Sequence, residues 1–338
     1  MLKVAINGFG RIGRSSFKIA LDKFSKELEI VGINDLTDSK TLAHLLKYDS
    51  NYGVWDRNVL ADNSPTEEYI TVDGKKYPVF KEKEPQSLPW KKLEVDVVIE
   101  STGHFTDKAG ASLHLQAGAK KVVLSAPAKG GDVPTLVLGV NGDKYAGEEV
   151  INNASCTTNC IAPVAEVINQ KFGILKAMMT TIHAYTQDQN LQDGPHKDLR
   201  RARAAATNIV PTSTGAAIST TEVIPELKGL FDGVAIRVPV AVGSISDFTF
   251  LLKKKVTVEE VNKALAEASE SAHLKGILAV TNEPIVSSDI VGRSESAIVD
   301  LGLTQVVDGD MVKIFAWYDN EFGYSNRLIE QVLNVGKA

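Results

Sequence analysis

Residues Lys3–Asp35 read KVAINGFGRIGRSSFKIALDKFSKELEIVGIND, and this stretch decides the fold. An apolar strand at Lys3–Asn7 runs directly into a GxGxxG turn at 8–13 and then into a helical pattern that ends near Phe24. A second apolar strand follows at Glu29–Asn34. This order of strand, glycine-rich turn, helix and strand predicts a βαβ unit of a parallel sheet.

The three glycines of the turn have separate tasks. Gly8 allows the tight turn, Gly10 lets the backbone approach a pyrophosphate, and Gly13 lets helix and strand pack closely. Such turns also arise for packing alone, but the flanking elements and the spaced acid Asp35 favour a dinucleotide site. Asp35 is placed to bind ribose hydroxyls, and its charge disfavours a 2′-phosphate. The stretch therefore predicts NAD in preference to NADP.

A second informative cluster is Ala154–Cys160, Ala-Ser-Cys-Thr-Thr-Asn-Cys, which opens the apolar helical run Ile161–Phe172. The unmatched N–H groups of a helix N-terminus carry partial positive charge, so we expect the thiolate of Cys156 to be favoured there. Downstream, Ile174–Thr186 reads as a buried strand with His183 near its polar end. An inert buried cysteine and a hydrogen-bonded core histidine are the alternatives. Together the two residues favour a nucleophile with its base.

The other cysteine, Cys160, is either a core-facing residue of the same helix or a resolving thiol, and the first interpretation is preferred. Two cysteines four residues apart cannot build a disulfide framework. No second Cys or His pair has the spacing of zinc ligands, so no metal is expected.

Composition indicates a compact soluble enzyme. The chain has 338 residues, is 43% hydrophobic and has a formal net charge of −5, which suggests two domains with sizeable cores. The mild acidity provides no field for nucleic acid or an anionic membrane. We expect no leader peptide and no membrane span, and therefore a cytoplasmic protein.

Strand and helix patterns alternate to about residue 150, as in a parallel sheet covered on both faces. The remaining elements expected in this half are helices at Asp38–Lys47 and Asp107–Ala117, strands at Val95–Glu100 and Lys121–Ser125, a hairpin at Tyr69–Phe80 turning at Asp73-Gly74, and a surface loop at Glu84–Trp90.

The second half is dominated by long strand-like runs, which predict a largely antiparallel sheet with helices on one face. The runs are Gly233–Val242, Ser244–Lys255 and Met311–Asp319. A capping box, Thr257-Val-Glu-Glu260, starts a helix that runs to about Ser271, and Gly323–Val335 is helical again.

Arginines supply the cations that an acidic chain needs for anionic ligands. The long loop Gln187–Val210 contains Arg200, Arg201 and Arg203, which by composition alone form a solvated charge run. Arg237 lies within an apolar strand, where an unpaired guanidinium is costly to bury. Either a structural carboxylate or a substrate phosphate could be its partner.

Short motifs follow one another along nearly the whole chain: INGFGRIGR at Ile6–Arg14, ESTGHFT at Glu100–Thr106, SAPA at Ser125–Ala128, ASCTTNC at Ala154–Cys160, HAYT at His183–Thr186, PHKDLRRARAA at Pro195–Ala205, PTSTGAA at Pro211–Ala217, RVP at Arg237–Pro239 and WYDNEFGYSNR at Trp317–Arg327. In these motifs and their order the chain resembles the family of phosphorylating glyceraldehyde-3-phosphate dehydrogenases.

The resemblance implies an α/β fold class: a Rossmann-type doubly wound parallel sheet plus an α+β catalytic domain with a largely antiparallel sheet. The NAD-binding domain would span residues 1–150 and be completed by the C-terminal helix at 319–338. The catalytic domain would be the insert 151–318.

The resemblance also implies residue roles. Cys156 and His183 would be catalytic. The cofactor NAD would be bound by Gly8, Gly10, Arg11, Ile12, Gly13, Asp35, Lys83, Thr102, Gly103, Ser125 and Asn320. Substrate and inorganic phosphate would be bound by Ser155, Thr157, Thr186, Arg200, Thr214, Gly215 and Arg237.

The implied reaction is the NAD-dependent oxidative phosphorylation of D-glyceraldehyde 3-phosphate to 1,3-bisphosphoglycerate through a hemithioacetal and a thioester. The implied assembly is a homotetramer in which the loop Gln187–Val210 is supported by a neighbouring subunit. Competing interpretations are erythrose-4-phosphate dehydrogenase, a cysteine hydrolase, and a nucleotide-binding regulatory or moonlighting protein.

Two departures from the family pattern affect the implied cofactor site. The segment Val240–Phe248 follows RVP without the threonine and the Asn-Val-Ser segment that are common there. Lys83 stands where an arginine is usual, which keeps the charge but loses the planar fork.

Overall fold

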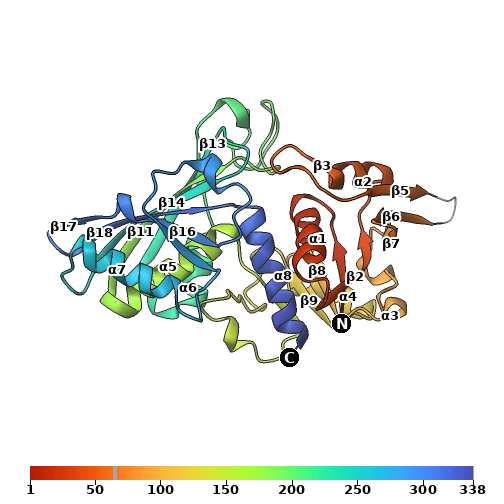
Figure 1. Cartoon of the computed structure of the whole chain (residues 1–338), viewed down its shortest axis with the longest axis horizontal. Coiled ribbons are helices and arrows are strands. Elements are labelled where there is room, and N and C mark those ends of the chain that lie inside the picture. The colour runs from red at the N-terminus through yellow and green to blue at the C-terminus, as the bar shows by residue number, and fades with distance from the viewer. Residues whose placement is uncertain (64–66, 338) are drawn as a thin grey trace. The chain divides into compact units, whose positions relative to one another are not determined.

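The computed structural model describes residues 1–63 and 67–337 (Figure 1). The chain forms two compact units. The first comprises Met1–Leu136, Lys144–Ala154 and Ser325–Ala338, and the second comprises Val137–Asp143 and Ser155–Tyr324.

The sheet of the first unit has the strand order β10-β9-β8-β1-β2-β7-β6-β5. Its strands are β1 (Leu2–Asn7), β2 (Leu28–Asn34), β5 (Val59–Asn63), β6 (Glu68–Val72), β7 (Lys75–Phe80), β8 (Val97–Glu100), β9 (Lys121–Leu124) and β10 (Val150–Asn152). From β10 to β7 all neighbours are parallel, whereas β6 and β5 are added antiparallel. The predicted hairpin is confirmed as β6 and β7.

This strand order positions the cofactor motif. The chain leaves β1 toward β2 on one side and returns as β8 on the other, so the order reverses at β1. Ligands of open parallel sheets bind beyond the carboxyl ends of the strands at such a point. The strand ends that meet there are Asn7, Asn34 and Glu100.

The helices of the first unit are α1 (Arg11–Lys23), α2 (Ser39–Lys47), α3 (Trp90–Leu93) and α4 (Lys108–Gln116), and most of α8 (Phe322–Lys337) belongs to it as well. Asp38 caps α2 by accepting a hydrogen bond from the Thr41 N–H, and Asp107 caps α4 by accepting one from the Gly110 N–H. The short side chains of these caps satisfy N–H groups that a helix start leaves unmatched, which is why both helices begin where predicted.

The predicted surface loop Glu84–Trp90 is wrong. Residues Pro85–Ser87 form the 3₁₀ helix η1, and Trp90 begins α3 with its side chain fully buried. The Trp90 indole Nε1 donates a hydrogen bond of 3.0 Å to Nδ1 of His114, which is also buried. This long-range partner satisfies the buried indole N–H.

The second unit contains a mixed sheet of order β12-β13-β11-β14-β18-β16-β15, with β17 paired to β18. Its strands are β11 (Ile174–Ala184), β12 (Val210–Ser213), β13 (Phe231–Val238), β14 (Ser244–Leu252), β15 (Leu278–Thr281), β16 (Ala297–Asp300), β17 (Gln305–Val307) and β18 (Met311–Tyr318). The largely antiparallel sheet is confirmed, with β11–β13 and β15–β16 as parallel exceptions.

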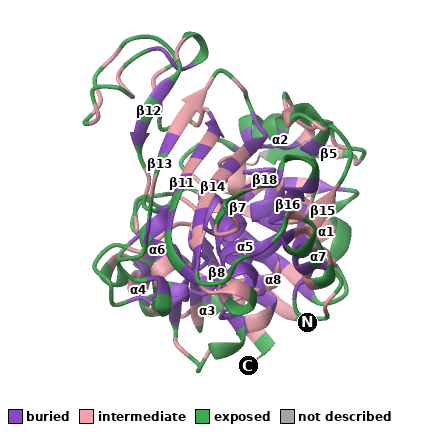
Figure 2. Ribbon diagram, turned by 90° about the vertical axis from the view of Figure 1, so that its left-hand side faces the viewer, coloured by how far each residue is buried: buried purple, intermediate pink, exposed green. Residues whose placement is uncertain are grey.

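Helices α5 (Cys156–Phe172), α6 (Ala216–Val223) and α7 (Val258–Ser269) lie together on one side of these strands (Figure 1). Burial along β14 alternates strictly between buried and half-buried residues, so one face of the strand is covered by helices (Figure 2). The capping box of α7 is present as predicted.

Short elements complete the described chain. They are the strand pair β3 (Tyr48–Asp49) and β4 (Gly53–Val54) and the 3₁₀ helices η2 (Gly142–Lys144), η3 (Ala205–Thr207), η4 (Pro225–Leu227), η5 (Ser287–Ile290) and η6 (Leu301–Leu303). Within the described ranges, the helices are all too short or too polar to cross a bilayer.

Candidate active site

The start of α5 presents Cys156 as its first residue. Ser155 is the N-cap, and its hydroxyl accepts a hydrogen bond of 3.0 Å from the Thr158 N–H. Ala154 precedes the cap with φ of 55°, a left-handed conformation that is strained for a residue with a Cβ. Such strain is concentrated at functional sites. The half-buried thiol thus sits at the predicted helix terminus.

His183 approaches this thiol from β11. Its Nε2 lies 3.4 Å from the Cys156 Sγ, and its Nδ1 lies 2.7 Å from the Ala184 carbonyl oxygen. Arg237 Nη1 is also 3.1 Å from Nδ1, but its two protons have acceptors in the Ala184 carbonyl and the Thr186 hydroxyl. Because a carbonyl can only accept, we assign the ring proton to Nδ1. The lone pair of Nε2 then faces the sulfur, which is the orientation of a general base.

Burial dominates the electrostatics of the pair. It raises the pKa of the Cys156 thiol, while the charge of Arg237 and hydrogen bonds from Thr157 oppose the rise. Burial and Arg237 also lower the pKa of His183 to about 3. The expected preference for thiolate is therefore not found here, because desolvation outweighs the helix terminus. Both shifts favour the uncharged forms, a thiol and a neutral imidazole, over a charged pair.

Arg237 stands next to His183 because β13 runs parallel to β11 with these two residues in register. Its Nη1 donates to the Ala184 carbonyl and to the Thr186 hydroxyl, both at 3.2 Å. Its Nε is buried without a hydrogen-bond partner, and no carboxylate in the described part of the chain forms an ion pair with it. An incompletely satisfied buried guanidinium indicates a site for an anion.

The hydroxyls of Ser155 and Thr157 are engaged within the protein. Ser155 caps α5, and the Thr157 hydroxyl is 2.9 Å from the buried hydroxyl of Tyr318. Thr157 is 4% exposed, so its hydroxyl is enclosed by the protein rather than open to a ligand. Because the Thr157 hydroxyl is engaged, the backbone N–H of Thr157 at the start of the helix is the group of this residue that could donate to an oxyanion.

Thr214 and Gly215 form the start of α6. Gly215 is the N-cap, and the Thr214 hydroxyl accepts a hydrogen bond of 3.2 Å from the Ala216 N–H. A helix start provides N–H groups suited to an anion. These two residues therefore occupy a position consistent with the predicted phosphate contacts.

The loop Gln187–Val210 presents its arginines differently from the prediction. Arg200 is exposed, its backbone N–H donates to Asp198 at 2.9 Å, and its carbonyl accepts from the Arg203 N–H at 3.3 Å. Arg201 donates to Thr212 at 2.9 Å and pairs with Asp188 at 2.5 Å, and its charge contributes to the lowered pKa of both His183 and Arg237. The sequence analysis missed Arg201, because adjacency in a loop does not reveal which arginine turns inward.

The glycine turn in the first unit has the backbone geometry of a pyrophosphate loop. Gly8 has φ of +92°, and a Cβ there would lie 2.6 Å from the Thr102 nitrogen. A Cβ on Gly13 would lie 2.2 Å from the Gly8 carbonyl oxygen. At Gly10 a Cβ would meet nothing within 4 Å, and φ is an ordinary −72°. Neither the backbone conformation nor a neighbouring atom therefore requires a glycine at position 10. The missing side chain leaves open space beside the backbone.

Asp35 lies beside this turn. Its carboxylate accepts hydrogen bonds from the Phe9 N–H at 2.8 Å and the Thr37 N–H at 2.9 Å. Ile12 is in the first turn of α1, as is Arg11, whose guanidinium pairs with Asp49 at 2.7 Å. The Arg11 side chain is thus engaged in an ion pair within the protein, and its backbone N–H is one of those at the N-terminus of α1.

The other predicted cofactor residues follow neighbouring strand ends. Thr102 donates to Glu100 through its N–H at 2.8 Å and through its hydroxyl, and Gly103 follows with φ of +76°. Ser125 directly follows β9 and donates its N–H to the Glu100 carbonyl at 2.9 Å. Lys83 is exposed beyond β7. These four residues lie where the strand order predicts a ligand.

Asn320 belongs to the second unit and follows β18. It is buried, and its Oδ1 accepts hydrogen bonds from the Gly243 N–H at 3.1 Å and the Ser244 hydroxyl at 2.9 Å. The side chain is therefore fixed in orientation. Sequence reasoning did not single out Ser244, since its partner lies 76 residues away.

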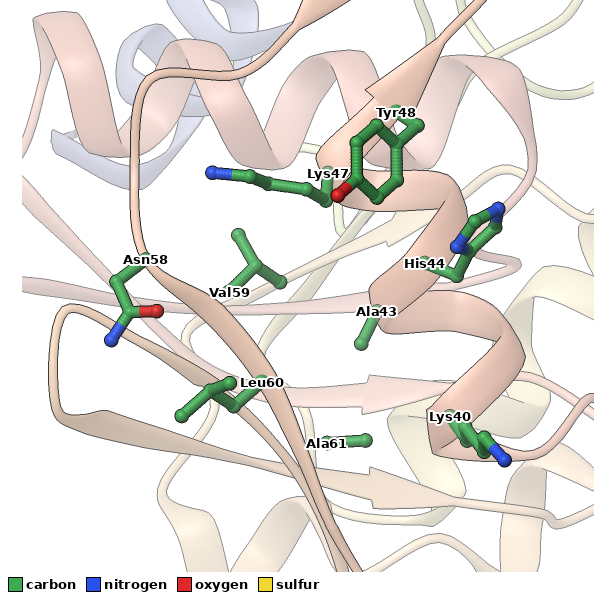
Figure 3. Close-up of a pocket in the computed structure, with 9 residues that line it drawn as sticks. All are labelled: Lys40, Ala43, His44, Lys47, Tyr48, Asn58, Val59, Leu60 and Ala61. Carbon is green, nitrogen blue, oxygen red and sulfur yellow. The ribbon is translucent and has the colours of Figure 1, made fainter.

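A separate pocket of about 390 Å³ lies between α2 and β5 (Figure 3). It is lined by Lys40, Ala43, His44, Lys47, Tyr48, Asn58, Val59, Leu60 and Ala61. None of the predicted site residues lines it. No group of three or more metal-ligating side chains occurs in the described ranges.

Comparison with models of known protein families shows to which family this chain belongs. Residues 2–108 match the family model of the glyceraldehyde 3-phosphate dehydrogenase NAD binding domain, and residues 155–320 match that of the C-terminal domain. The chain belongs to the glyceraldehyde 3-phosphate dehydrogenase family.

Individual members of the glyceraldehyde 3-phosphate dehydrogenase family are similar over the full chain. The glyceraldehyde-3-phosphate dehydrogenase of Streptomyces coelicolor is 55% identical over 337 residues, which cover 99% of this chain and 98% of that protein. Those of Mycolicibacterium smegmatis and Mycobacterium tuberculosis are 55% identical over 343 and 342 residues, covering 100% of this chain and 99% of each protein. The predicted family, the α/β fold class and an NAD-dependent oxidoreductase are thereby confirmed.

Proposed function

We propose that this chain oxidises D-glyceraldehyde 3-phosphate with NAD and inorganic phosphate to give 1,3-bisphosphoglycerate. The observation that carries the proposal is the 3.4 Å contact between Cys156 Sγ and His183 Nε2 beside Arg237. It joins a nucleophile, a base and a cation for an anionic substrate. A cysteine hydrolase would need only the nucleophile and the base, and it would not need a glycine turn for a dinucleotide.

The residues of the first unit fit NAD. Gly10 leaves open space where a phosphate would approach the backbone, and the first turn of α1 faces the same place. Asp35 is anchored beside the turn through two backbone N–H groups, so its carboxylate is available for ribose hydroxyls and repels a 2′-phosphate. NAD, when bound, supplies the acceptor for the hydride.

Cys156 and His183 perform the oxidation half of the proposed mechanism. Sγ bonds to the aldehyde carbon, and the thiol proton passes through His183 to the former carbonyl oxygen, giving a hemithioacetal. His183 then removes this hydroxyl proton as the hydride leaves the carbon. The product is a thioester on Cys156 beside a protonated His183.

Inorganic phosphate completes the reaction. Its oxygen attacks the thioester carbon, the C–S bond breaks, and the departing Cys156 thiolate takes the proton held by His183. The attacking phosphate releases its own proton to solvent. Arg237 with Thr186, Thr214 with Gly215, Ser155, the Thr157 N–H and Arg200 are the proposed donors to the two phosphate groups.

A spectrophotometric assay tests the function. NADH formation from glyceraldehyde 3-phosphate should require phosphate or arsenate for multiple turnovers, because without them the thioester accumulates. Erythrose 4-phosphate, tested at the same concentrations, should be used less efficiently in kcat/KM. Phosphate-independent turnover would favour a hydrolase, and a preference for erythrose 4-phosphate would reassign the substrate.

We also propose a homotetramer located in the cytoplasm, with no nucleic acid as primary partner. Ion pairs such as Arg203–Asp193 at 2.9 Å hold the loop Gln187–Val210 internally. Yet Leu191, Leu199 and Ile209 in this loop remain 71–81% exposed. Three strongly exposed large apolar side chains in one loop support burial of this loop against another subunit. Light scattering should give four times the 36.5 kDa chain mass, and a fully active monomer would contradict the proposal.

A further inference from the structure

The first residue of β14, Ser244, connects the backbone beside the base to Asn320. Ser244 is 1% exposed, and its Oγ accepts a hydrogen bond of 3.1 Å from the Ala184 N–H. Its hydroxyl donates to the Asn320 Oδ1 at 2.9 Å. Ala184 directly follows His183 and also accepts the Nδ1 proton through its carbonyl. One buried hydroxyl thus contacts the strand of the base and the side chain of Asn320.

The direction of each hydrogen bond follows from groups that can only donate. The Gly243 N–H lies 3.1 Å from Asn320 Oδ1, so the amide atom facing it must be the oxygen. The Ala184 N–H is likewise a pure donor, so Ser244 must accept from it and direct its own proton to Asn320. Both lone-pair positions of Oδ1 are therefore used, and Nδ2 is turned away from Ser244.

The turn before β14 holds this arrangement in place. Gly243 has φ of +96°, and a Cβ there would lie 2.5 Å from the Ser287 carbonyl oxygen. A larger residue is excluded by both its conformation and its surroundings. The segment that departs from the family pattern, Val240–Phe248, thus contains a rigid turn that directs a backbone donor at Asn320.

We propose that Ser244 is a positioning residue for the nicotinamide cofactor. It fixes the Asn320 carboxamide so that Nδ2 is presented as a donor to the carboxamide oxygen of the nicotinamide ring. It also ties this contact to the backbone that orients His183. The inference rests on the proposed function, because it assumes that Asn320 contacts the nicotinamide.

Ser246 provides a matched control. It lies two residues further along β14 on the same face and is also fully buried, and its hydroxyl lies against the Cys160 thiol without a hydrogen bond to any nitrogen or oxygen in the described structure. Ser244→Ala and Ser246→Ala therefore remove the same atom from equally buried positions of one strand. Only the first removes the anchor of Asn320.

The primary experiment measures NAD affinity by calorimetry and the steady-state constants of both variants. Ser244→Ala should raise the Kd and KM for NAD about 3- to 10-fold, the range for one net hydrogen bond. Ser246→Ala should change neither by more than about twofold. Equal effects of both substitutions, or no effect of Ser244→Ala, would overturn the proposal.

A double-mutant cycle separates positioning from a merely structural role. Because Ser244 acts through Asn320, Ser244→Ala should add less than about twofold to the Kd in an Asn320→Ala background. Fully additive effects would refute the coupling. Asn320→Asp keeps an oxygen for Gly243 and Ser244 but loses the Nδ2 donor, so it should weaken NAD binding even if Ser244→Ala does not fold.

The cofactor analogue thio-NAD, whose carboxamide oxygen is replaced by sulfur, gives an independent readout. Sulfur is a weaker acceptor, so the wild type should bind NAD more tightly than thio-NAD, and Ser244→Ala should reduce this ratio. An unchanged ratio would contradict the inference while leaving the proposed function intact. Failure of the wild type to bind NAD or form NADH would reject both.

Discussion

Gly13 touches Gly8 backbone to backbone: a Cβ on Gly13 would lie 2.2 Å from the Gly8 carbonyl oxygen. The Gly8 backbone cannot move away from such an added methyl group as the end of a flexible side chain could. Gly13→Ala should therefore destabilise the fold by about 1–3 kcal/mol, the usual cost of overpacking. The midpoint of urea unfolding without cofactor measures this loss.

Gly10→Ala should behave in the opposite way. A Cβ there meets nothing within 4 Å, so stability should change by no more than about 0.5 kcal/mol. NAD affinity should fall at least about tenfold, because the added methyl group occupies space needed by the pyrophosphate. A Gly10→Ala protein with unchanged NAD affinity would show that the open space has no role in binding.

Cys156 and Cys160 should differ completely in reactivity. Cys160 is fully buried, its Sγ faces the Ala316 carbonyl at 3.8 Å, and burial raises its pKa. Cys156→Ser should abolish nearly all dehydrogenase activity but leave NAD binding, because an oxygen ester is not formed or released as readily as a thioester. Cys160→Ser should retain most activity.

Peptide mapping after treatment with iodoacetamide checks this assignment. Alkylation should follow Cys156 and coincide with loss of activity. Stoichiometric labelling of Cys160, with Cys156 unmodified in an inactive protein, would reverse the roles of the two thiols.

The features that sequence predicted best are those decided locally. The glycine turn, Asp35 and the start of α5 each depend on neighbours in the chain, so motif and spacing were sufficient for their placement. Trp90 shows the limit, because its burial depends on His114, which is remote in sequence. A surface loop was the natural prediction from the prolines before it.

Side-chain direction at the site could not be predicted for a similar reason. Thr157 and Cys156 are adjacent, but only packing against β18 decides that the threonine hydroxyl meets Tyr318. The raised pKa of the Cys156 thiol is also a tertiary effect, since a helix start in water would favour the thiolate. Burial by the surrounding strands is not visible in the local sequence.

Arg237 is expected to serve both the substrate and the thiol. Arg237→Leu should raise KM for glyceraldehyde 3-phosphate by about one to two orders of magnitude, since a charged hydrogen bond contributes about 1.5–3 kcal/mol. Its charge lowers the pKa of Cys156, so its loss should shift the alkylation profile of that thiol to higher pH. Arg203→Leu is the control, because Arg203 is exposed and pairs with Asp193. Equal KM values for both variants would remove Arg237 from the substrate site.

The last prediction concerns acid stability at Asp96, which directly precedes β8. Its carboxylate accepts the Lys3 N–H at 2.8 Å and pairs with Lys120 at 2.8 Å. Burial raises the pKa of this carboxyl, but Lys120 and the Lys3 N–H lower it by more, so the folded pKa lies below its ordinary value. The group therefore stabilises the fold above its unfolded pKa of about 3.9 and loses this effect as pH falls through the folded pKa.

Asp96→Asn should cost about 1 kcal/mol or less at pH 7, and the difference from wild type should shrink below about pH 4. Urea unfolding at both pH values measures it, with Asp56→Asn as control, because Asp56 is exposed and forms no ion pair within the described ranges. A difference that stays constant with pH would mean that the carboxylate charge does not contribute.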